Sequence, residues 1–165
     1  MLVIDQLIIN IISNIICVPL TIFFTFITHL GDYLNIWIFI GFISLFFIAC
    51  RKMGILLISS TLVLSLLNNS IIKVIFSRER PCVLNDSLIV CPSSFSMPSG
   101  HSLTSFAAAT IIYYYNKRLG IGAYLLACLI AISRVYLGVH YPSDVIIGGL
   151  LGVTLVIIFF KKVGR

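Results

Sequence analysis

The segment from Ser133 to Asp144, Ser-Arg-Val-Tyr-Leu-Gly-Val-His-Tyr-Pro-Ser-Asp, joins two apolar stretches and places three ionisable side chains between them. An ionisable residue such as Arg134 is costly beside hydrocarbon, so its presence indicates a functional site. His140 and Asp144 are four residues apart, and Pro142 favours a helix start between them. The carboxylate would then accept a hydrogen bond from one imidazole nitrogen and leave the other free to attack. The alternative, for this pair alone, is a solvated helix cap.

The composition around this segment is that of a membrane protein. The chain has 165 residues, of which 60% are hydrophobic and 10% charged, and its mean hydropathy is +1.16. A soluble domain of this size cannot bury so much apolar surface. We therefore predict one all-α domain over residues 1–165, a polytopic helix bundle in the bilayer. We expect no cleavable signal peptide, because no basic region precedes the first apolar run.

Apolar runs predict five transmembrane helices, at residues 33–50, 53–76, 100–116, 119–139 and 143–160. Residues 4–28 are also apolar, but polar side chains interrupt them. They form either a sixth span or a pair of short helices in the membrane interface, and Asn10 and Asn14 favour the interface. The longest polar connection is residues 77–98.

The net charge of +6 is unevenly distributed along these spans. Seven basic residues lie at one set of span ends, in the clusters Arg51-Lys52, Lys117-Arg118 and Lys161-Lys162 with Arg165. The positive-inside rule assigns these ends to the cytoplasm. The opposite ends carry the remaining cations and most acids: Lys73, Arg78, Arg80, Arg134, Asp32, Glu79, Asp86 and Asp144. This placement argues against nucleic-acid binding and predicts a polar site on the extracytoplasmic face of the cell membrane.

Lys73 and Arg80 precede the polar connection and are seven residues apart, which is two helical turns. If the helix continues, they share a face and form a clamp for an anion such as phosphate. The alternative is that these cations flank a span and extend to the lipid headgroups. That alternative suits Arg78 better than Lys73, which lies deeper in the apolar run.

Pro98-Ser99-Gly100-His101 leads directly into the third predicted span. Gly100 lets the backbone approach a ligand, and the first N–H groups of a helix bind anions. His101 would then be placed to give a proton to a leaving oxygen. The alternative is an ordinary serine-capped helix start. His29 and Asp32 flank a glycine in a predicted turn, and we expect a structural role for both.

Together, Lys73-x6-Arg80-Pro81, Pro98-Ser99-Gly100-His101 and Ser133-Arg134-x5-His140-x3-Asp144 resemble the three-part signature of the type 2 phosphatidic acid phosphatase family. This family shares its core with the vanadium haloperoxidases. The resemblance covers residues 73–144, and the apolar segments are similar to its membrane-bound branch. Full-length bacterial members usually have six spans. The segment ending at Asp32 is similar to their interfacial stretch, so we expect the usual first span to be missing here.

The resemblance and the chemistry of these residues together predict the mechanism. His140 attacks phosphorus, Asp144 orients it, and His101 protonates the departing oxygen. The phosphoryl oxygens are held by Lys73, Arg80, Ser99, Gly100 and Arg134. We expect no metal or other cofactor, because the cations replace magnesium and the nearby acids are dispersed along the chain.

An outward-facing site between spans suits a lipid phosphate. A small bacterial member with such a site most resembles the undecaprenyl diphosphate phosphatases; the alternative is a phosphatidylglycerophosphate or phosphatidate phosphatase. A non-catalytic protein that binds anionic lipids would need the cations but not the histidines. No polar stripe crosses the membrane, which argues against a channel.

The five cysteines fall into two groups. Cys17, Cys50 and Cys128 lie in apolar runs and are expected to be small core residues. Cys82 and Cys91 lie in the outward connection, where an oxidising compartment would allow a disulfide.

Overall fold

The computed structural model describes residues 3–32, 35–84 and 87–163, and within these ranges it contains helices, turns and loops but no strand. The all-α prediction is confirmed. The helices are α1 (Val3–Ser13), α2 (Val18–Gly31), α3 (Asn35–Leu45), α4 (Arg51–Leu67), α5 (Lys73–Phe76), α6 (Pro81–Leu84), α7 (Gly100–Tyr115), α8 (Lys117–Tyr136) and α9 (Pro142–Val163). A π turn, Asn68–Ile72, joins α4 to α5. Arg165 and Asp86, named above, lie outside the described residues.

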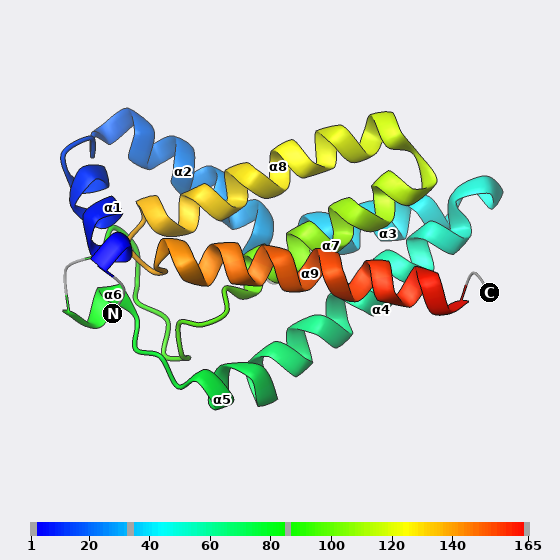
Figure 1. Cartoon of the computed structure of the whole chain (residues 1–165). Coiled ribbons are helices and arrows are strands. Elements are labelled where there is room, and N and C mark those ends of the chain that lie inside the picture. The colour runs from blue at the N-terminus through cyan, green and yellow to red at the C-terminus, as the bar shows by residue number, and fades with distance from the viewer. Residues whose placement is uncertain (1–2, 33–34, 85–86, 164–165) are drawn as a thin grey trace.

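Helix α7 forms the centre of the bundle and packs against α4, α8 and α9 (Figure 1). Its sequence is rich in Ala, Ser and Thr, and small residues allow helix backbones to approach closely. Two glycines of α9 complete this contact. A Cβ at Gly152 would lie 2.2 Å from the carbonyl oxygen of Leu103, and one at Gly148 would lie 2.6 Å from that of Ser99. Helix α9 is therefore held directly against the start of α7.

Three segments are long and apolar enough to cross a membrane: Ile48–Phe76, Lys117–Tyr136 and Pro142–Lys162. Val18–Gly31 and Ile36–Leu45, bent by 47° relative to each other, would together make a fourth. The protein is thus a multi-pass membrane protein, but the predicted count of five spans is not confirmed. Helix α7 has only 16 residues, and α3 ends at Leu45, before the predicted boundary at residue 50.

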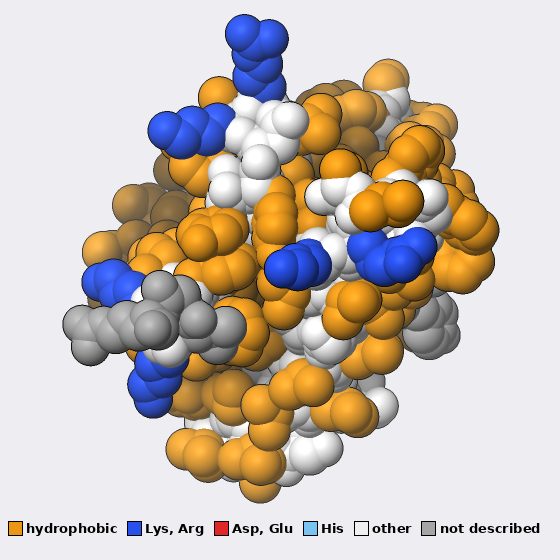
Figure 2. Space-filling view, turned by 90° about the vertical axis from the view of Figure 1, so that its right-hand side faces the viewer, with side chains coloured by type: hydrophobic (Ala, Val, Ile, Leu, Met, Phe, Trp, Pro, Cys, Tyr) orange, Lys and Arg blue, Asp and Glu red, His pale blue; other side chains and the backbone are white. Residues whose placement is uncertain are grey.

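The two ends of the bundle differ in charge. The end that holds the α7–α8 turn and the C-terminal part of α9 shows Lys and Arg side chains among apolar ones, with no acidic side chain in view (Figure 2). Helices α1 and α6 lie at the opposite end (Figure 1). The basic clusters are therefore gathered at one end, as the positive-inside interpretation requires.

The N-terminal segment forms two helices, α1 and α2, separated at residues 14–17, which agrees with the interpretation as a pair of short helices. The hydroxyl of Tyr136 at the end of α8 fixes their junction. It accepts a hydrogen bond from the Cys17 backbone N–H and lies 3.2 Å from Thr21 Oγ1.

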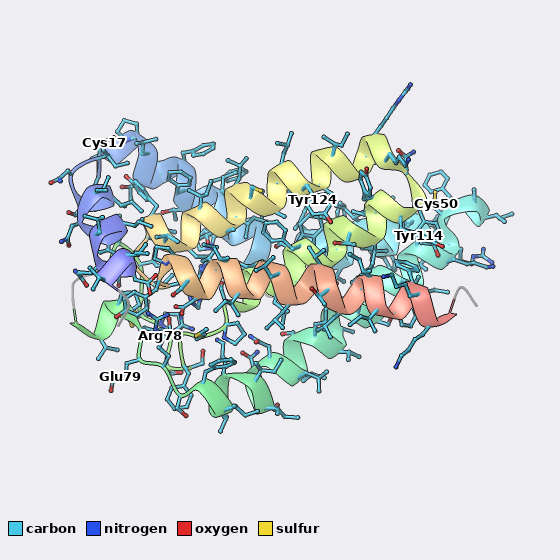
Figure 3. All side chains as sticks on the ribbon, in the orientation of Figure 1. Cys17, Cys50, Arg78, Glu79, Tyr114 and Tyr124 are labelled. Atoms are coloured by element: carbon cyan, nitrogen blue, oxygen red, sulfur yellow. A yellow bond between two sulfur atoms is a disulfide. The ribbon has the colours of Figure 1, made fainter. Side chains whose placement is uncertain are left out.

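The prediction that the apolar-run cysteines lie in the core is wrong for two of them. Cys17 and Cys128 are exposed, and Cys50 is half-buried. Their runs belong to helices whose outer faces carry apolar side chains, so a small apolar residue there can face lipid. Cys17 and Cys50 lie at opposite ends of the molecule (Figure 3). Cys82 and Cys91 are joined in a disulfide that ties α6 to the connection before α7.

Candidate active site

A cavity of about 790 Å³ contains most of the predicted site residues. Five different parts of the chain line it, and among the lining residues are Lys73, Arg80, Gly100, His101, Arg134 and His140. Asp144 lies directly behind His140, fully buried at the first turn of α9. The three sequence motifs, spread over 72 positions from Lys73 to Asp144, therefore meet at one site.

Lys73 and Arg80 meet in a way that the sequence did not predict. Helix α5 ends at Phe76, and Ser77 takes a left-handed conformation with φ of 44°, so the helix does not continue to Arg80. Both cations instead reach one hydroxyl. Lys73 Nζ and Arg80 Nη2 each donate to Ser94 Oγ at 3.0 Å. Lys73 and Arg80 are therefore brought together by the turn at Ser77 and by their shared contact with Ser94, and not by a common helix face as predicted.

Arg80 is almost fully buried and is held mainly by backbone oxygens. Its Nε donates to Ser94 O at 2.6 Å and its Nη1 to Val139 O at 2.9 Å. Burial, and secondarily the charge of Arg134, lowers the pKa of Arg80 to about 10. At neutral pH the guanidinium is still charged, so it presents a fixed cation to the cavity.

His140 is buried, and Arg80 Nη1 lies 3.1 Å from its Nε2. A guanidinium can only donate, so Nε2 is the acceptor and the ring proton is assigned to Nδ1. Burial first, and the nearby cations second, place the pKa of His140 well below its ordinary value. The ring is therefore neutral at pH 7, and the lone pair of Nε2 faces Arg80, which lines the same cavity as His140. This is the state that a nucleophile requires.

The predicted direct hydrogen bond between His140 and Asp144 is not formed. Nδ1 of His140 and Oδ2 of Asp144 are 3.6 Å apart, which is too long. Ser96 Oγ contacts both groups: it donates to Asp144 Oδ2 and lies 3.4 Å from His140 Nδ1. Ser96 therefore links the carboxylate of Asp144 to the ring of His140.

Asp144 is also held from its other side. Arg78 Nη1 donates to Oδ1 at 2.6 Å, and the Tyr141 backbone N–H donates to Oδ2 at 2.9 Å. Arg78 Nη2 reaches Asp5 Oδ2 of α1 at 2.7 Å. The expectation that Arg78 extends to lipid headgroups is wrong. Figure 3 shows Arg78 pointing into the protein and Glu79 pointing away from it.

The start of α7 is not an ordinary serine cap. Ser99 occupies the cap position, but its side chain makes no capping bond, and its buried Oγ has no hydrogen-bond partner among the described residues. Arg134 donates from Nη1 to Thr28 Oγ1 at 2.6 Å, whereas its Nε has no partner there either. Arg134 lines the cavity and brings an unpartnered guanidinium N–H to it, whereas Ser99 is fully buried and is not one of the lining residues.

His101 contacts a residue that the sequence assigned to a turn. Its Nε2 lies 2.9 Å from Oδ1 of Asp32, and His29 Nδ1 lies 2.6 Å from Oδ2 of the same carboxylate. The sequence predicted a structural role for His29 and Asp32 in a turn, and the structure places both among the residues that line the cavity. A Cβ at Gly31 would lie 2.8 Å from His101 Cδ2, so the glycine before Asp32 permits this approach.

Residues 53–165 match the model of the PAP2 superfamily. The chain belongs to this superfamily. An undecaprenyl-diphosphatase of Sulfolobus acidocaldarius is 36% identical over 121 residues, which cover 71% of this chain and 58% of the relative. Phosphatidylglycerophosphatase B of Bacillus subtilis is 36% identical over 111 residues, 59% of this chain and 53% of the relative. The PAP2 chain thus spans little more than half the length of these relatives.

Two solved structures resemble nearly the whole chain. The transmembrane PAP2-type phosphatidylglycerolphosphate phosphatase from Bacillus subtilis has a TM-score of 0.74 and 32% identity, covering 98% of this chain and 86% of its own. Aquifex aeolicus LpxE has a TM-score of 0.76 and 28% identity, covering 97% and 96%. The arrangement of helices around the cavity is therefore that of PAP2 phosphatases.

Three residues of this PAP2 site were missed by sequence reasoning: Asp5, Asp32 and Ser96. Asp5 is 139 positions from Asp144, and an isolated acid in an apolar helix gave no indication of its partner. Ser96 lies two residues before Pro98, and this closeness to the second motif could have indicated that it belongs to the site. Within the described ranges, no three His, Cys, Asp or Glu side chains are grouped so that they could hold a metal ion.

Proposed function

We propose that this PAP2 chain is a membrane lipid phosphatase that hydrolyses a lipid phosphate or diphosphate through a phosphohistidine, without a metal. One observation carries the proposal: the neutral His140 faces a cavity that three buried cations line, with His101 also on the wall. An anion-binding protein would need the cations alone. The nucleophile and the second histidine supply what the chemistry needs in addition.

In the first step, Nε2 of His140 forms a bond to phosphorus while the bond from phosphorus to the lipid oxygen breaks. His101 gives that oxygen a proton. Water then attacks phosphorus, His101 takes a proton from the water, and the bond to His140 breaks. Lys73, Arg80 and Arg134, with Ser99 Oγ and the N–H groups near Gly100, hold the phosphoryl oxygens, whose charge must be stabilised in both steps.

Undecaprenyl diphosphate is the substrate that we propose first, supported by the similar protein named undecaprenyl-diphosphatase. The alternative is phosphatidylglycerophosphate, supported by a similar protein named phosphatidylglycerophosphatase B and by the related structure. The whole chain would form one domain in the cell membrane. Its site would face the extracytoplasmic side, since the basic clusters lie at the other end (Figure 2).

The proposal is tested by phosphate release from purified protein in detergent with EDTA present, offering undecaprenyl diphosphate, phosphatidylglycerophosphate and phosphatidate side by side. We expect release to survive EDTA and to vanish in His140→Ala, and the order of rates identifies the substrate class. Arg118→Gln, at the opposite basic end, is the control and should retain full rate. A His140→Ala protein that keeps full rate would contradict the nucleophile, and absence of release from all three lipids would favour simple lipid binding.

A further inference from the structure

Asp32 lies between two histidines, His101 and His29, which both line the cavity. Its Oδ1 lies 2.9 Å from His101 Nε2 and its Oδ2 lies 2.6 Å from His29 Nδ1. The side chain of His29 is 65% exposed and that of His101 19% exposed. The carboxylate therefore connects the histidine assigned to proton transfer with one that solvent reaches.

The end of α2 is fixed against the site by further contacts, so Asp32 is not a freely placed surface acid. Gly31 packs against His101 and Ile130, where even a Cβ would be too close. One turn earlier, Thr28 is fully buried and accepts the hydrogen bond from Arg134. These contacts on α7 and α8 determine where the carboxylate lies.

The charges around His101 show why a carboxylate is needed there. Lys73 from α5, Arg80 from the loop after it, and Arg134 from α8 line the same cavity, and His140 faces it from the bend before α9. Burial, and then the like charges of Arg134 and Lys73, lower the pKa of His101 to about 4, although the hydrogen bond with Asp32 opposes this loss of the proton. The other site carboxylate, Asp144, is taken up by Arg78, Tyr141 N and Ser96. Among the residues that line the cavity, Asp32 is the acid.

We propose that Asp32 is the positioning residue for the proton-transferring histidine: it accepts the Nε2–H of His101, favours the charged ring against the surrounding cations, and turns Nδ1 toward the lipid oxygen. This inference rests on the proposed phosphatase function. Each histidine of the site then has its own carboxylate, Asp144 for His140 and Asp32 for His101.

The proton balance follows from this arrangement. When the bond from phosphorus to the lipid oxygen breaks, that oxygen takes the Nδ1 proton, and His101 becomes neutral while its Nε2–H stays on Asp32. When water attacks the phosphohistidine, Nδ1 recovers a proton from the water and phosphate leaves His140. Asp32 keeps its negative charge throughout, so it stabilises the imidazolium form of His101 at the start and at the end of the cycle.

The test compares Asp32→Asn with wild type on two substrates. The alcohol of a lipid monophosphate is a poor leaving group that needs a proton, whereas the 4-nitrophenolate of 4-nitrophenyl phosphate departs without one. We expect kcat for the lipid to fall by about 100-fold, the lower range for losing general acid catalysis, and kcat for the aryl phosphate to fall by less than about 5-fold. A merely structural role would lower both rates equally, and that result would overturn the proposal.

A second readout uses the lipid substrate alone, so it does not depend on turnover of the aryl phosphate. Loss of the Asp32 charge should move the alkaline limb of the kcat profile to lower pH by about one unit or more, and Asp32→Glu should restore it in part. Glu79→Gln is the matched control, an exposed acid at the same end of the bundle. An unmoved alkaline limb in Asp32→Asn overturns the inference, whereas a wild type inactive on every lipid phosphate overturns the proposed function instead.

Discussion

At the scale of single residues, the site is governed by which nitrogen of each histidine is engaged. Nε2 of His140 accepts a hydrogen bond from Arg80, and Nδ1 faces Ser96. Because a guanidinium can only donate hydrogen bonds, the proton of the neutral ring is assigned to Nδ1. A phosphoryl oxygen entering the cavity would take the Arg80 N–H and release the Nε2 lone pair. We therefore expect a bound phosphoryl group to free Nε2 of His140 for the proposed attack.

The neutral state of His140 makes a prediction about pH. Its pKa is placed well below 6.5 by burial and by the nearby cations. A lowered histidine pKa means that the neutral form persists as the solution is acidified below pH 6.5 and is lost only at much lower pH. Nitrogen NMR of histidine-labelled protein, compared with His140→Ala, should show a neutral ring with its proton on Nδ1 at pH 6. A ring titrating at its ordinary pKa of 6.5 would contradict the assigned state.

At the scale of the elements, α1 is joined to the site through a chain of alternating charges. Asp5 is buried, and its Oδ1 accepts from the backbone N–H of Ser143 while its Oδ2 holds Arg78. Arg78 also lies over the ring of Tyr141, 4.0 Å from its centroid. The first helix is thus attached to the start of α9, where Asp144 lies beside His140, the proposed nucleophile.

Arg78→Gln should therefore damage both stability and activity. The substitution leaves two buried carboxylates without their shared cation, which costs about 3 kcal/mol when a buried pair is broken, and it frees Asp144 to shift away from His140. We expect a lower unfolding temperature in detergent and a lower kcat. Arg118→Gln changes an exposed arginine in the same way and should have neither effect.

The variant Asp5→Asn measures how much the contacts of α1 contribute to the stability of the protein. Burial raises the pKa of Asp5, but the hydrogen bonds from Arg78 and Ser143 outweigh it, and the pKa falls below the ordinary 3.8. The stabilisation is therefore fully present above pH 3.8 and is lost as the pH falls through the lowered value. The difference in unfolding temperature between wild type and Asp5→Asn should narrow in acid below about pH 4. A difference that stays constant into acid would exclude this ion pair as its source.

The same scale shows what the sequence could predict. The histidines and cations of the three motifs were found because they occur in short, ordered patterns, and the helix start at Pro142 followed from proline's fixed φ. The end of α5 was missed, because the left-handed residue is Ser77 and no glycine or proline marks it. Asp5 and Asp32 were missed because their partners are set by how α1 and α2 dock, which local patterns do not encode.

At the scale of the whole molecule, the polar site and the basic clusters occupy opposite ends of an apolar bundle (Figures 1 and 2). The cysteines are distributed in a way that tests orientation. Cys82 and Cys91 belong to the connection that holds the site, and Cys50 directly precedes the basic pair at the start of α4. If the site faces outward, these thiols lie on different sides of the membrane.

We therefore expect a membrane-impermeant maleimide to label Cys82 and Cys91 in intact cells only after reduction, and to label Cys50 only after the cells are opened. Single-cysteine variants identify each labelled position by mass spectrometry. Labelling of Cys50 in intact cells would show the inverted orientation. The orientation stays a prediction from the charge pattern. The predicted span count was not confirmed, because α2, α3 and α7 are short helices within continuous apolar sequence.

The unpartnered Ser99 Oγ and Arg134 Nε affect the molecule beyond the reaction itself. A buried polar group without a partner lowers stability by about 1–3 kcal/mol, and we expect an anion in the cavity to relieve that penalty at Arg134, which lines it. Orthophosphate, the released product, should then protect the protein against heat while it competes with substrate. At a high phosphate concentration we therefore expect the protein to be more stable and its turnover to be slower. At a low phosphate concentration we expect faster turnover and lower stability.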